Sequence, residues 1–418
     1  MTPTAEELAA GAPQPAKAPI RAVLSQASFR TFWIAQLMSQ LVGGTVRFAF
    51  IWLVLGLSDW PGAPGAIAFA AGLPPLLLSL PAGVWSDRWD RRRLIILGAR
   101  ISAFFLLVCA LLAVSGHMRL PFAIALAALV SCGLAVMVPA QQAAVPSLVP
   151  RDRLMTGVAL QNVGMQVSIF VGALLGGASI AGLGMGGAFA VLGTLLLASS
   201  LLMRAVELPR AAIGAERSTR LGADIREGIA FALSKDPLRS LVLSGAVVGV
   251  SWGVVQINLP EISKQILGRG VLATSLLISG FAPGMLLSSL YLASRRSLRR
   301  KGLLFGLAMG LGLGTGEILL ALSHSYLLSL FIVFVWGVAG GVAMTCQRSL
   351  LQSLTPDVMM GRVMGIHALT LLGAFPLSAL FSFALSERLG ADGTLLLAGV
   401  LTLLGAPWLV FRKAVRRA

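Results

Sequence analysis

An apolar stretch near the start of the chain, residues 31–57, carries a regular stripe of polar and small residues. Their spacing of three to four residues places on one helix face Gln36, Gln40, Gly43, Gly44 and Arg47. Arg47 lies ten residues before the end of the stretch, about 15 Å along a helix. If the stretch crosses a bilayer, a charge at that depth costs about 2.5–3.5 kcal/mol. We therefore expect the stripe to face a water-filled cavity, where Arg47 attracts an anionic or phenolate-like compound.

Two other roles for Arg47 remain open, namely a polar contact that holds helices together and an ion pair with Glu317 or Glu261. Further polar and aromatic residues inside apolar stretches follow the same logic. Ser244, Ser251 and Asn258 recur every seven residues, and Thr370 lies near His367. The residues expected to line a substrate cavity are Gln36, Gln40, Arg47, Asn162, Gln166, Ser251, Trp252, Gln256, Trp336 and His367.

Glu317 is the only acidic residue well inside an apolar stretch. A buried acid that can be neutralised costs less than a permanent charge, so Glu317 is the expected contributor to proton coupling.

Other chemistry has no support in the sequence. We find no phosphate-binding Gly-Lys-Ser loop, no metal-ligand cluster and no nucleophile–base pair, so we expect no catalytic residues, no bound metal and no cofactor. Three cysteines, Cys109, Cys132 and Cys346, all fall in apolar runs and are expected to pack as small hydrophobic side chains.

The composition indicates what kind of structure positions these residues. The chain has 418 residues, of which 57% are hydrophobic and 12% are charged, and its mean hydropathy is +0.87. A soluble protein carries about 25% charged residues, so this chain is typical of proteins that reside in a bilayer. The net charge of +17 does not indicate a nucleic-acid partner, because the basic residues form short clusters between apolar runs.

Twelve apolar runs are long enough to span a membrane, and they divide into six and six around the longest polar interval. We expect an all-α membrane protein with twelve transmembrane helices in two pseudo-symmetric six-helix bundles. The expected organisation is a flexible tail (1–28), a first bundle (29–206), a central loop (207–237), a second bundle (238–411) and a basic tail (412–418).

The basic residues predict the orientation. If the N-terminus lies in the cytoplasm, 28 Lys and Arg residues fall in cytoplasmic segments and only four in external loops, which hold Arg119, Lys264, Arg269 and Arg388. This asymmetry predicts a multi-pass protein of a bacterial cytoplasmic membrane with both termini inside.

The two halves also repeat each other. SDRWDRRR from Ser86 matches SRRSLRRK from Ser294, and QAAVPSLVP from Gln142 matches RSLLQSLTP from Arg348, at offsets of 208 and 206. Similar offsets at separate places predict a duplicated six-helix unit with parallel copies.

The segment GVWSDRWDRRR, which begins at Gly83, resembles the loop signature of the major facilitator superfamily, Gly-x-x-x-Asp-Arg-x-Gly-Arg-Arg. The matching residues are Gly83, Asp87, Arg88, Arg91 and Arg92, and Asp90 stands where the superfamily usually has its second Gly. With GTVRFAFIWLVLGLS from Gly44, the sequence resembles the drug and siderophore exporter branch, which includes enterobactin-type exporters and macrolide efflux proteins. The stretch GALLGG from Gly172 is similar to the exporter motif Gly-Pro-x-x-Gly-Gly, with Ala173 in place of Pro.

The resemblance implies a conformational latch, in which Asp87 meets the start of the eleventh span near Arg362 when the inner side is closed. A carboxylate is favoured there by free N–H groups and the helix dipole. Arg91 is expected to orient Asp87. In the second half Arg295 replaces Asp87, so that copy cannot form the same contact.

The sequence thus predicts a monomeric transporter, surrounded by membrane lipid, that exports a small amphipathic molecule with the proton gradient. A lipid or lysolipid flippase, an importer, and a non-transporting sensor or scaffold on the same fold remain alternatives.

Overall fold

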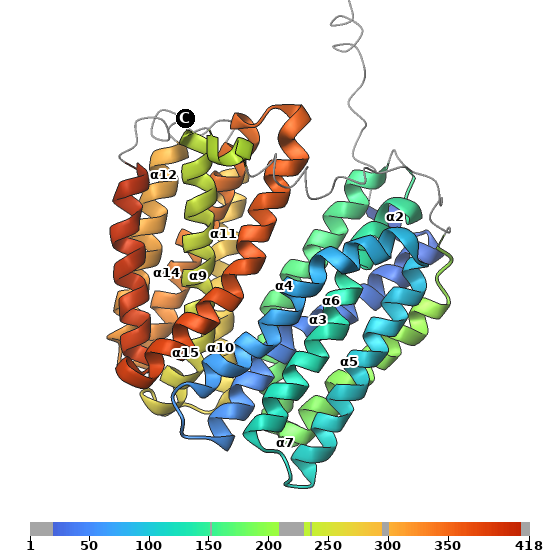
Figure 1. Cartoon of the computed structure of the whole chain (residues 1–418), viewed down its shortest axis with the longest axis horizontal. Coiled ribbons are helices and arrows are strands. Elements are labelled where there is room, and N and C mark those ends of the chain that lie inside the picture. The colour runs from blue at the N-terminus through green and yellow to red at the C-terminus, as the bar shows by residue number, and fades with distance from the viewer. Residues whose placement is uncertain (1–19, 151–152, 209–229, 235, 295–300, 411–418) are drawn as a thin grey trace, which may run out of the picture.

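The computed structural model describes residues 20–150, 153–208, 230–234, 236–294 and 301–410. Every regular element in these ranges is a helix, and the helices form two bundles that lie side by side (Figure 1). Apolar sequence explains this choice, because a segment in lipid must satisfy its own backbone hydrogen bonds and an α-helix does so internally.

The first bundle begins with the short helix α2 (Ile20–Leu24). The spanning helices are α3 (Ala27–Leu57), α4 (Ala63–Arg88), α5 (Arg91–Val114), α6 (Leu120–Leu148) and α7 (Leu154–Arg204). Helix α7 contains two spans, because the chain reverses at Gly184, where φ is 70° and ψ is 179°. A positive φ strains any residue with a Cβ, so glycine is the residue that suits this reversal. The first bundle therefore has six spans.

The second bundle follows the same plan. Its elements are α9 (Asp236–Gln265), α10 (Val271–Ser279), α11 (Phe281–Ser294), α12 (Lys301–Leu307), the π-helix η2 (Ala308–Gly314), α13 (Thr315–Ala321), α14 (Tyr326–Leu354) and α15 (Asp357–Val410). Two spans are interrupted. Helices α10 and α11 together make one, and α12, η2 and α13 make another. Helix α15 contains two spans joined at Gly390, where φ is 72° and ψ is 178°.

Within the described ranges, nine helices are long and apolar enough to cross a membrane, and a shorter apolar helix covers Ala63–Leu78. Two of the nine contain a reversal and hold two spans each. The twelve spans and two six-helix bundles expected from the sequence are therefore confirmed. Of the segments expected outside the bundles, residues 1–19, 209–229 and 411–418 lie outside the described residues.

We name the two ends of the molecule by the segments that lie there. The terminal end holds α2, the α4–α5 junction and the start of α9, and it is uppermost in Figure 1. The far end holds the reversals at Gly184 and Gly390 and the connection between α3 and α4.

The two bundles pack against each other in the half of the molecule nearer the far end. Helix α15 contacts α4, and α10 contacts α7. A Cβ at Gly65 of α4 would lie 2.5 Å from the backbone nitrogen of Phe383 in α15, so only glycine allows this approach. Three hydrogen bonds cross the same region: Ser279 to the Phe170 carbonyl, Lys264 to the Leu55 carbonyl, and the Trp60 indole to Glu387.

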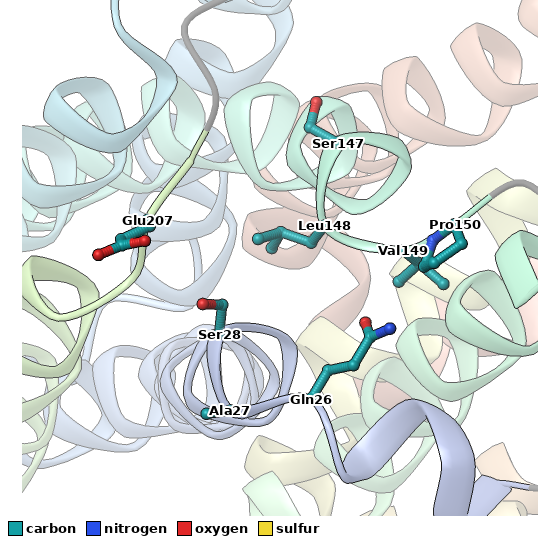
Figure 2. A pocket seen from close by; sticks show the side chains of 8 residues that line it. All are labelled: Gln26, Ala27, Ser28, Ser147, Leu148, Val149, Pro150 and Glu207. Carbon is teal, nitrogen blue, oxygen red and sulfur yellow. The ribbon is translucent and has the colours of Figure 1, made fainter.

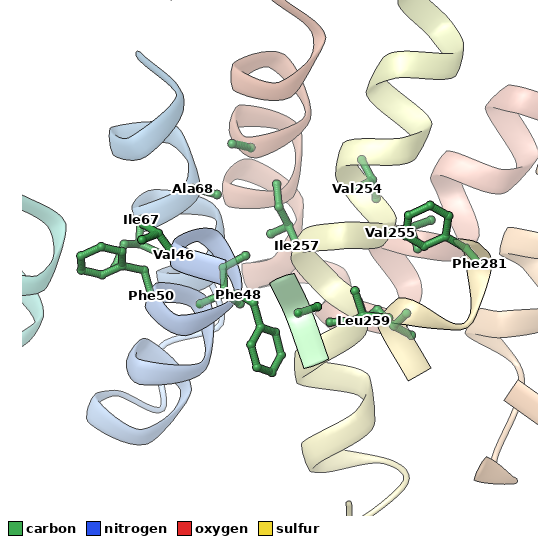
Figure 3. Packing of buried hydrophobic residues seen from close by; sticks show 14 of the residues in the cluster. Val46, Phe48, Phe50, Ile67, Ala68, Val254, Val255, Ile257, Leu259 and Phe281 are labelled. Carbon is green, nitrogen blue, oxygen red and sulfur yellow. The ribbon is translucent and has the colours of Figure 1, made fainter. Parts of the chain in front are cut away.

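The buried apolar side chains show the same asymmetry. One cluster covers the second bundle and continues into the far half of the first, and Figure 3 shows part of it, with Val46 and Phe50 on one side and Val254 and Ile257 on the other. A second, separate cluster fills the terminal half of the first bundle, around Phe29 and Ile95. The core is therefore continuous across the bundles only in the first cluster, which corresponds to a conformation closed at the far end.

Candidate transport site

Arg47 of α3 lies between the two bundles. Its guanidinium carbon is 3.9 Å from the centroid of the Phe375 ring of α15, a cation–π contact that crosses from one bundle to the other. The neighbouring Val46 and Phe48 are buried, whereas Arg47 is exposed. Part of the Arg47 side chain is therefore left uncovered by protein near the place where the bundles meet.

The described ion pairs do not include Arg47, so the alternative pairings with Glu317 and Glu261 have no support among the described residues. Glu261 is buried near the far end of α9, and one of its carboxyl oxygens has no hydrogen-bond partner. Among the described residues, the cation therefore contacts an aromatic ring rather than a carboxylate.

The rest of the stripe on α3 is less exposed than its pattern predicts. Gln40 is half-buried and faces α7. A Cβ placed on Gly164 of α7 would lie 3.0 Å from the Oε1 atom of Gln40. Gln36 is only 2% exposed, and its Oε1 has no hydrogen-bond partner. Packing covers this part of the stripe, for Gln40 against α7, and Arg47 is its exposed member. A place for Gln36 in a cavity stays a prediction.

Asn162 and Gln166 lie one turn apart on α7, and both are exposed, as their shared face predicts. The glycines of the GALLGG stretch lie further along the same helix. A Cβ at Gly172 would lie 3.0 Å from the Gly44 backbone of α3, and one at Gly177 would clash with Ser275 of α10. Thr45 donates a hydrogen bond of 2.8 Å to the Gly172 carbonyl. These glycines thus pack α7 against α3 and also against the second bundle.

Glu317 sits inside the second bundle and is 0% exposed. The Ser251 hydroxyl of α9 hydrogen-bonds one carboxyl oxygen, and the Thr402 hydroxyl of α15 lies 3.4 Å from the other. Three helices of one bundle therefore meet at this acid.

The Trp336 ring of α14 stacks on Trp252 with centroids 5.1 Å apart, and the Trp252 edge packs on Phe281 at 4.3 Å. Trp336 is buried, while Trp252 and Gln256 are half-buried.

The π-helix η2 directly precedes the turn that carries Glu317. Its sequence, AMGLGLG, contains Gly310, Gly312 and Gly314, and a Cβ at Gly314 would lie 2.7 Å from the Leu403 backbone of α15. Single π-turns inside helices are frequent at functional sites. Sequence reasoning missed this element, although the alternating glycines before a buried acid are a visible signal.

His367 of α15 is 6% exposed, and its Nδ1 has no hydrogen-bond partner. His367 and Gln347 of α14 both lie close to Gly245 of α9, because a Cβ placed on Gly245 would contact both side chains. The two side chains are therefore neighbours. The Gln347 amide donates a 2.8 Å bond to the Leu241 carbonyl of α9, and its repeat counterpart Gln141 donates a 2.9 Å bond to Ser39 of α3. The two glutamines thus link corresponding helix pairs.

The side chains of Asp87, Arg88 and Arg362 lie outside the described part of the structure, so the latch stays a prediction. Gly83 and Arg91 are half-buried. The Arg91 guanidinium donates to the Ser86 carbonyl at 3.2 Å, to the Ala143 carbonyl of α6 at 2.8 Å and to the Ser147 hydroxyl at 3.1 Å.

Arg92 donates to the Arg204 carbonyl at the end of α7. Asp90 caps α5, because its carboxylate accepts a 2.9 Å hydrogen bond from the Arg92 backbone N–H. The departure from the superfamily signature at Asp90 therefore has a local explanation, and the loop is tied to both α6 and α7.

The described pockets do not coincide with these residues. One of about 520 Å³ lies at the terminal end of the first bundle (Figure 2). Its lining consists of Gln26, Ala27, Ser28, Ser147, Leu148, Val149, Pro150 and Glu207. All of them belong to the first bundle and its end, so this pocket does not lie between the bundles. The described residues hold no group of three or more His, Cys, Asp or Glu side chains that could bind a metal.

Two six-helix bundles of transmembrane helices have the fold of transporters of the major facilitator type. The chain belongs to the transmembrane secretion effector family of that superfamily, which it matches over residues 18–417. Over 389 residues it is 25% identical to macrolide efflux protein A of Streptococcus pyogenes, covering 89% of this chain and 93% of that protein. The exporter-branch resemblance of the sequence is thereby confirmed, and the chain is a secondary transporter, not an enzyme.

Solved structures show the same fold. A bacterial homolog of the human lysosomal transporter Spinster, inward-facing and unoccupied, gives a TM-score of 0.70 at 14% identity, covering 96% of this chain and 98% of that chain. The nucleoside transporter NupG gives a TM-score of 0.74 at 12% identity, covering 93% and 100%. At these identities the likeness concerns the fold alone.

Proposed function

We propose that the chain exports a small amphipathic compound, anionic or phenolate-like, from the cytoplasm by alternating access. The observation that carries the proposal is the guanidinium of Arg47, which rests on Phe375 of the other bundle and has no ion-pair partner among the described residues. A cation beside an aromatic face suits a ligand with one acidic group and an apolar body. Its relative in S. pyogenes is named for efflux, which favours export over import.

The distribution of basic residues supports the orientation. By sequence, 28 Lys and Arg residues belong to segments on one side of the predicted spans and four to loops on the other, which supports a cytoplasmic position for both termini in a bacterial cell. The far end is then external, and the contacts between Gly65 and Phe383 close the molecule on the outside. In this conformation a substrate would enter from the cytoplasm, as export requires.

Binding and transport are connected through Arg47 and Phe375, because the two residues belong to different bundles. A ligand carboxylate or phenolate that pairs with Arg47 competes with the Phe375 ring for the guanidinium. The ligand would thereby loosen one contact between the bundles, and a ligand that favours one conformation shifts the population toward it. Glu317 is proposed as the protonatable group, held by Ser251 and Thr402 inside the second bundle.

The test is accumulation of matched fluorescent compounds in cells with and without the protein. Anionic and cationic amphipathic dyes of similar size are the matched probes, and a macrolide is added as a separate probe because of the relative's name. The proposal expects lower accumulation of the anionic dye in cells with the protein, and loss of that difference in Arg47→Gln. The control is Arg388→Gln, which makes the same substitution at an arginine of the far end.

Equal accumulation of every compound with and without the protein would contradict export. Net movement of a fluorescent phospholipid analogue in proteoliposomes, without movement of soluble dyes, would identify the alternative function of a lipid flippase.

A further inference from the structure

A second cavity, of about 650 Å³, lies at the terminal end of the first bundle, where the α4–α5 junction meets the end of α7. Its lining includes Trp89, Asp90, Arg93, Leu97, Arg100 and Arg204. No role described above uses these arginines. The cavity is formed entirely by the first bundle and is separate from Arg47.

One side of this cavity continues into a lipid-facing surface. Along α5, the side chains of Leu97, Phe104 and Leu111 are 50%, 61% and 68% exposed, and they recur every seven residues. The opposite face of α5, which includes Ala99 and Ser102, is buried against α6 and α7. Since the chain spans a membrane, an exposed apolar stripe of this kind contacts lipid tails.

Arg100 belongs to that same stripe, between Leu97 and Phe104. It lies nine residues after Arg91, the first residue of α5, or about 14 Å along the helix. A guanidinium on a lipid-facing surface extends along its aliphatic chain toward the headgroup region. Trp89, 56% exposed and stacked on Trp85 with centroids 5.9 Å apart, stands at the rim, and an exposed indole is typical of the level of lipid headgroups.

The charges in the cavity are not balanced. Asp90 lies 3.8 Å from Arg93 and already caps α5 through the Arg92 N–H. In the described part of the chain, the guanidinium groups of Arg100 and Arg204 have neither a hydrogen-bond acceptor nor a carboxylate partner. Three arginines against one aspartate leave a positive site at the edge of an apolar surface.

We propose that this cavity binds an anionic phospholipid. Its headgroup phosphate pairs with Arg100 and Arg204, with Arg93 nearby, and its acyl chain lies along Leu97, Phe104 and Leu111. A basic pocket at the boundary of the membrane is the kind of site that recognises anionic headgroups. A soluble anion would match the arginines but would leave the apolar stripe unused. The lipid would bridge the start of α5 and the end of α7, beside the hydrogen bond from Arg92 to the Arg204 carbonyl.

The experiment measures lipid binding to the purified full-length protein in detergent by native mass spectrometry. The probes are phosphatidylglycerol and phosphatidylcholine with identical acyl chains. The test variant is Arg100→Gln with Arg204→Gln. The matched control is Arg21→Gln with Arg30→Gln, which removes two exposed arginines from the same end of the same bundle. Neither pair leaves a buried partner unsatisfied, so both are expected to fold.

The proposal expects tighter binding of phosphatidylglycerol than of phosphatidylcholine by the wild type. Each arginine near a headgroup is worth about a five-fold change in affinity, so the test variant should weaken phosphatidylglycerol binding roughly twenty-five-fold and the control should not. Equal weakening in the control would show diffuse attraction and overturn the site. Competition by millimolar inorganic phosphate would show a soluble-anion site instead. A wild type without preference between the two lipids would overturn the proposal independently of any variant.

Discussion

The guanidinium of Arg47 in α3 rests on the ring of Phe375 in α15, with 3.9 Å between the guanidinium carbon and the ring centroid. The contact joins the two bundles at a depth where an unpaired charge is costly. Attraction to a ring face of this kind is worth about 0.5–2 kcal/mol, less than an insertion cost of about 2.5–3.5 kcal/mol. The proposed site requires hydration of Arg47 to supply part of the compensation, which leads to the first prediction.

A cysteine at position 47 should react with a small hydrophilic thiol reagent. The background should lack Cys109, Cys132 and Cys346, all of which are free thiols. An exported anionic compound should slow the reaction, because it occupies the same space. Mass spectrometry of the labelled protein measures the rate. If position 47 never labels under any condition, Arg47 is a buried structural residue and the proposed binding site is wrong.

Asp87→Asn should reduce transport roughly ten-fold or more, because a charge-assisted hydrogen bond of about 1.5–3 kcal/mol is lost from the proposed latch. Folding and insertion should be unaffected. Asp90→Asn is the matched control three residues later. Asn caps a helix as well as Asp does, so the cap on the Arg92 N–H should survive and transport should stay normal. Initial rates at equal expression measure both. Normal transport by Asp87→Asn would exclude the latch.

The repeat is the part of the fold that sequence reasoning predicts best. Gly184 and Gly390 lie 206 residues apart and have nearly identical backbone angles, and Gln141 and Gln347, at the same spacing, bind corresponding helices. Hydropathy and charge predict the transmembrane spans well, because a segment in lipid must form a helix to satisfy its backbone hydrogen bonds.

The site is less predictable, because it depends on packing between segments distant in sequence. The stripe on α3 places Gln36 and Arg47 on one face, but packing buries Gln36 and leaves Arg47 exposed. Nothing in the sequence pairs Arg47 with Phe375, 328 positions later. The partners of Glu317 come likewise from α9 and α15, and the sequence shows only the isolated acid.

Glu317→Gln should uncouple transport from an imposed pH gradient while sparing downhill exchange of substrate. Glutamine keeps the hydrogen bonds with Ser251 and Thr402 but cannot exchange a proton. Glu207→Gln, the same change at an exposed residue near the end of the first bundle, is the control. Proteoliposomes with and without a pH gradient measure the difference. Equal stimulation of the wild type and Glu317→Gln removes Glu317 from the mechanism, and no stimulation of the wild type removes proton coupling.

Gly65→Val should open the far end. A Cβ there would lie 2.5 Å from the Phe383 nitrogen and 2.7 Å from its Cα, and backbone cannot move aside as a flexible side chain can. Overpacking of about 1–3 kcal/mol would fall on the conformation closed at the far end, because the bundles separate there in the alternative one. The ratio of the two conformations should then shift roughly five- to hundred-fold.

The measurement is the labelling of a cysteine at position 47 by a membrane-impermeant reagent added outside intact cells, which should accelerate in Gly65→Val. Gly56→Val is the matched control, because a Cβ at Gly56 meets nothing within 4 Å. It should leave the labelling rate unchanged. The two variants separate the close approach to Phe383 from the general effect of placing valine in a glycine-containing helix. Unchanged labelling in Gly65→Val, with normal expression, would mean that the contact with Phe383 does not control access from the far end.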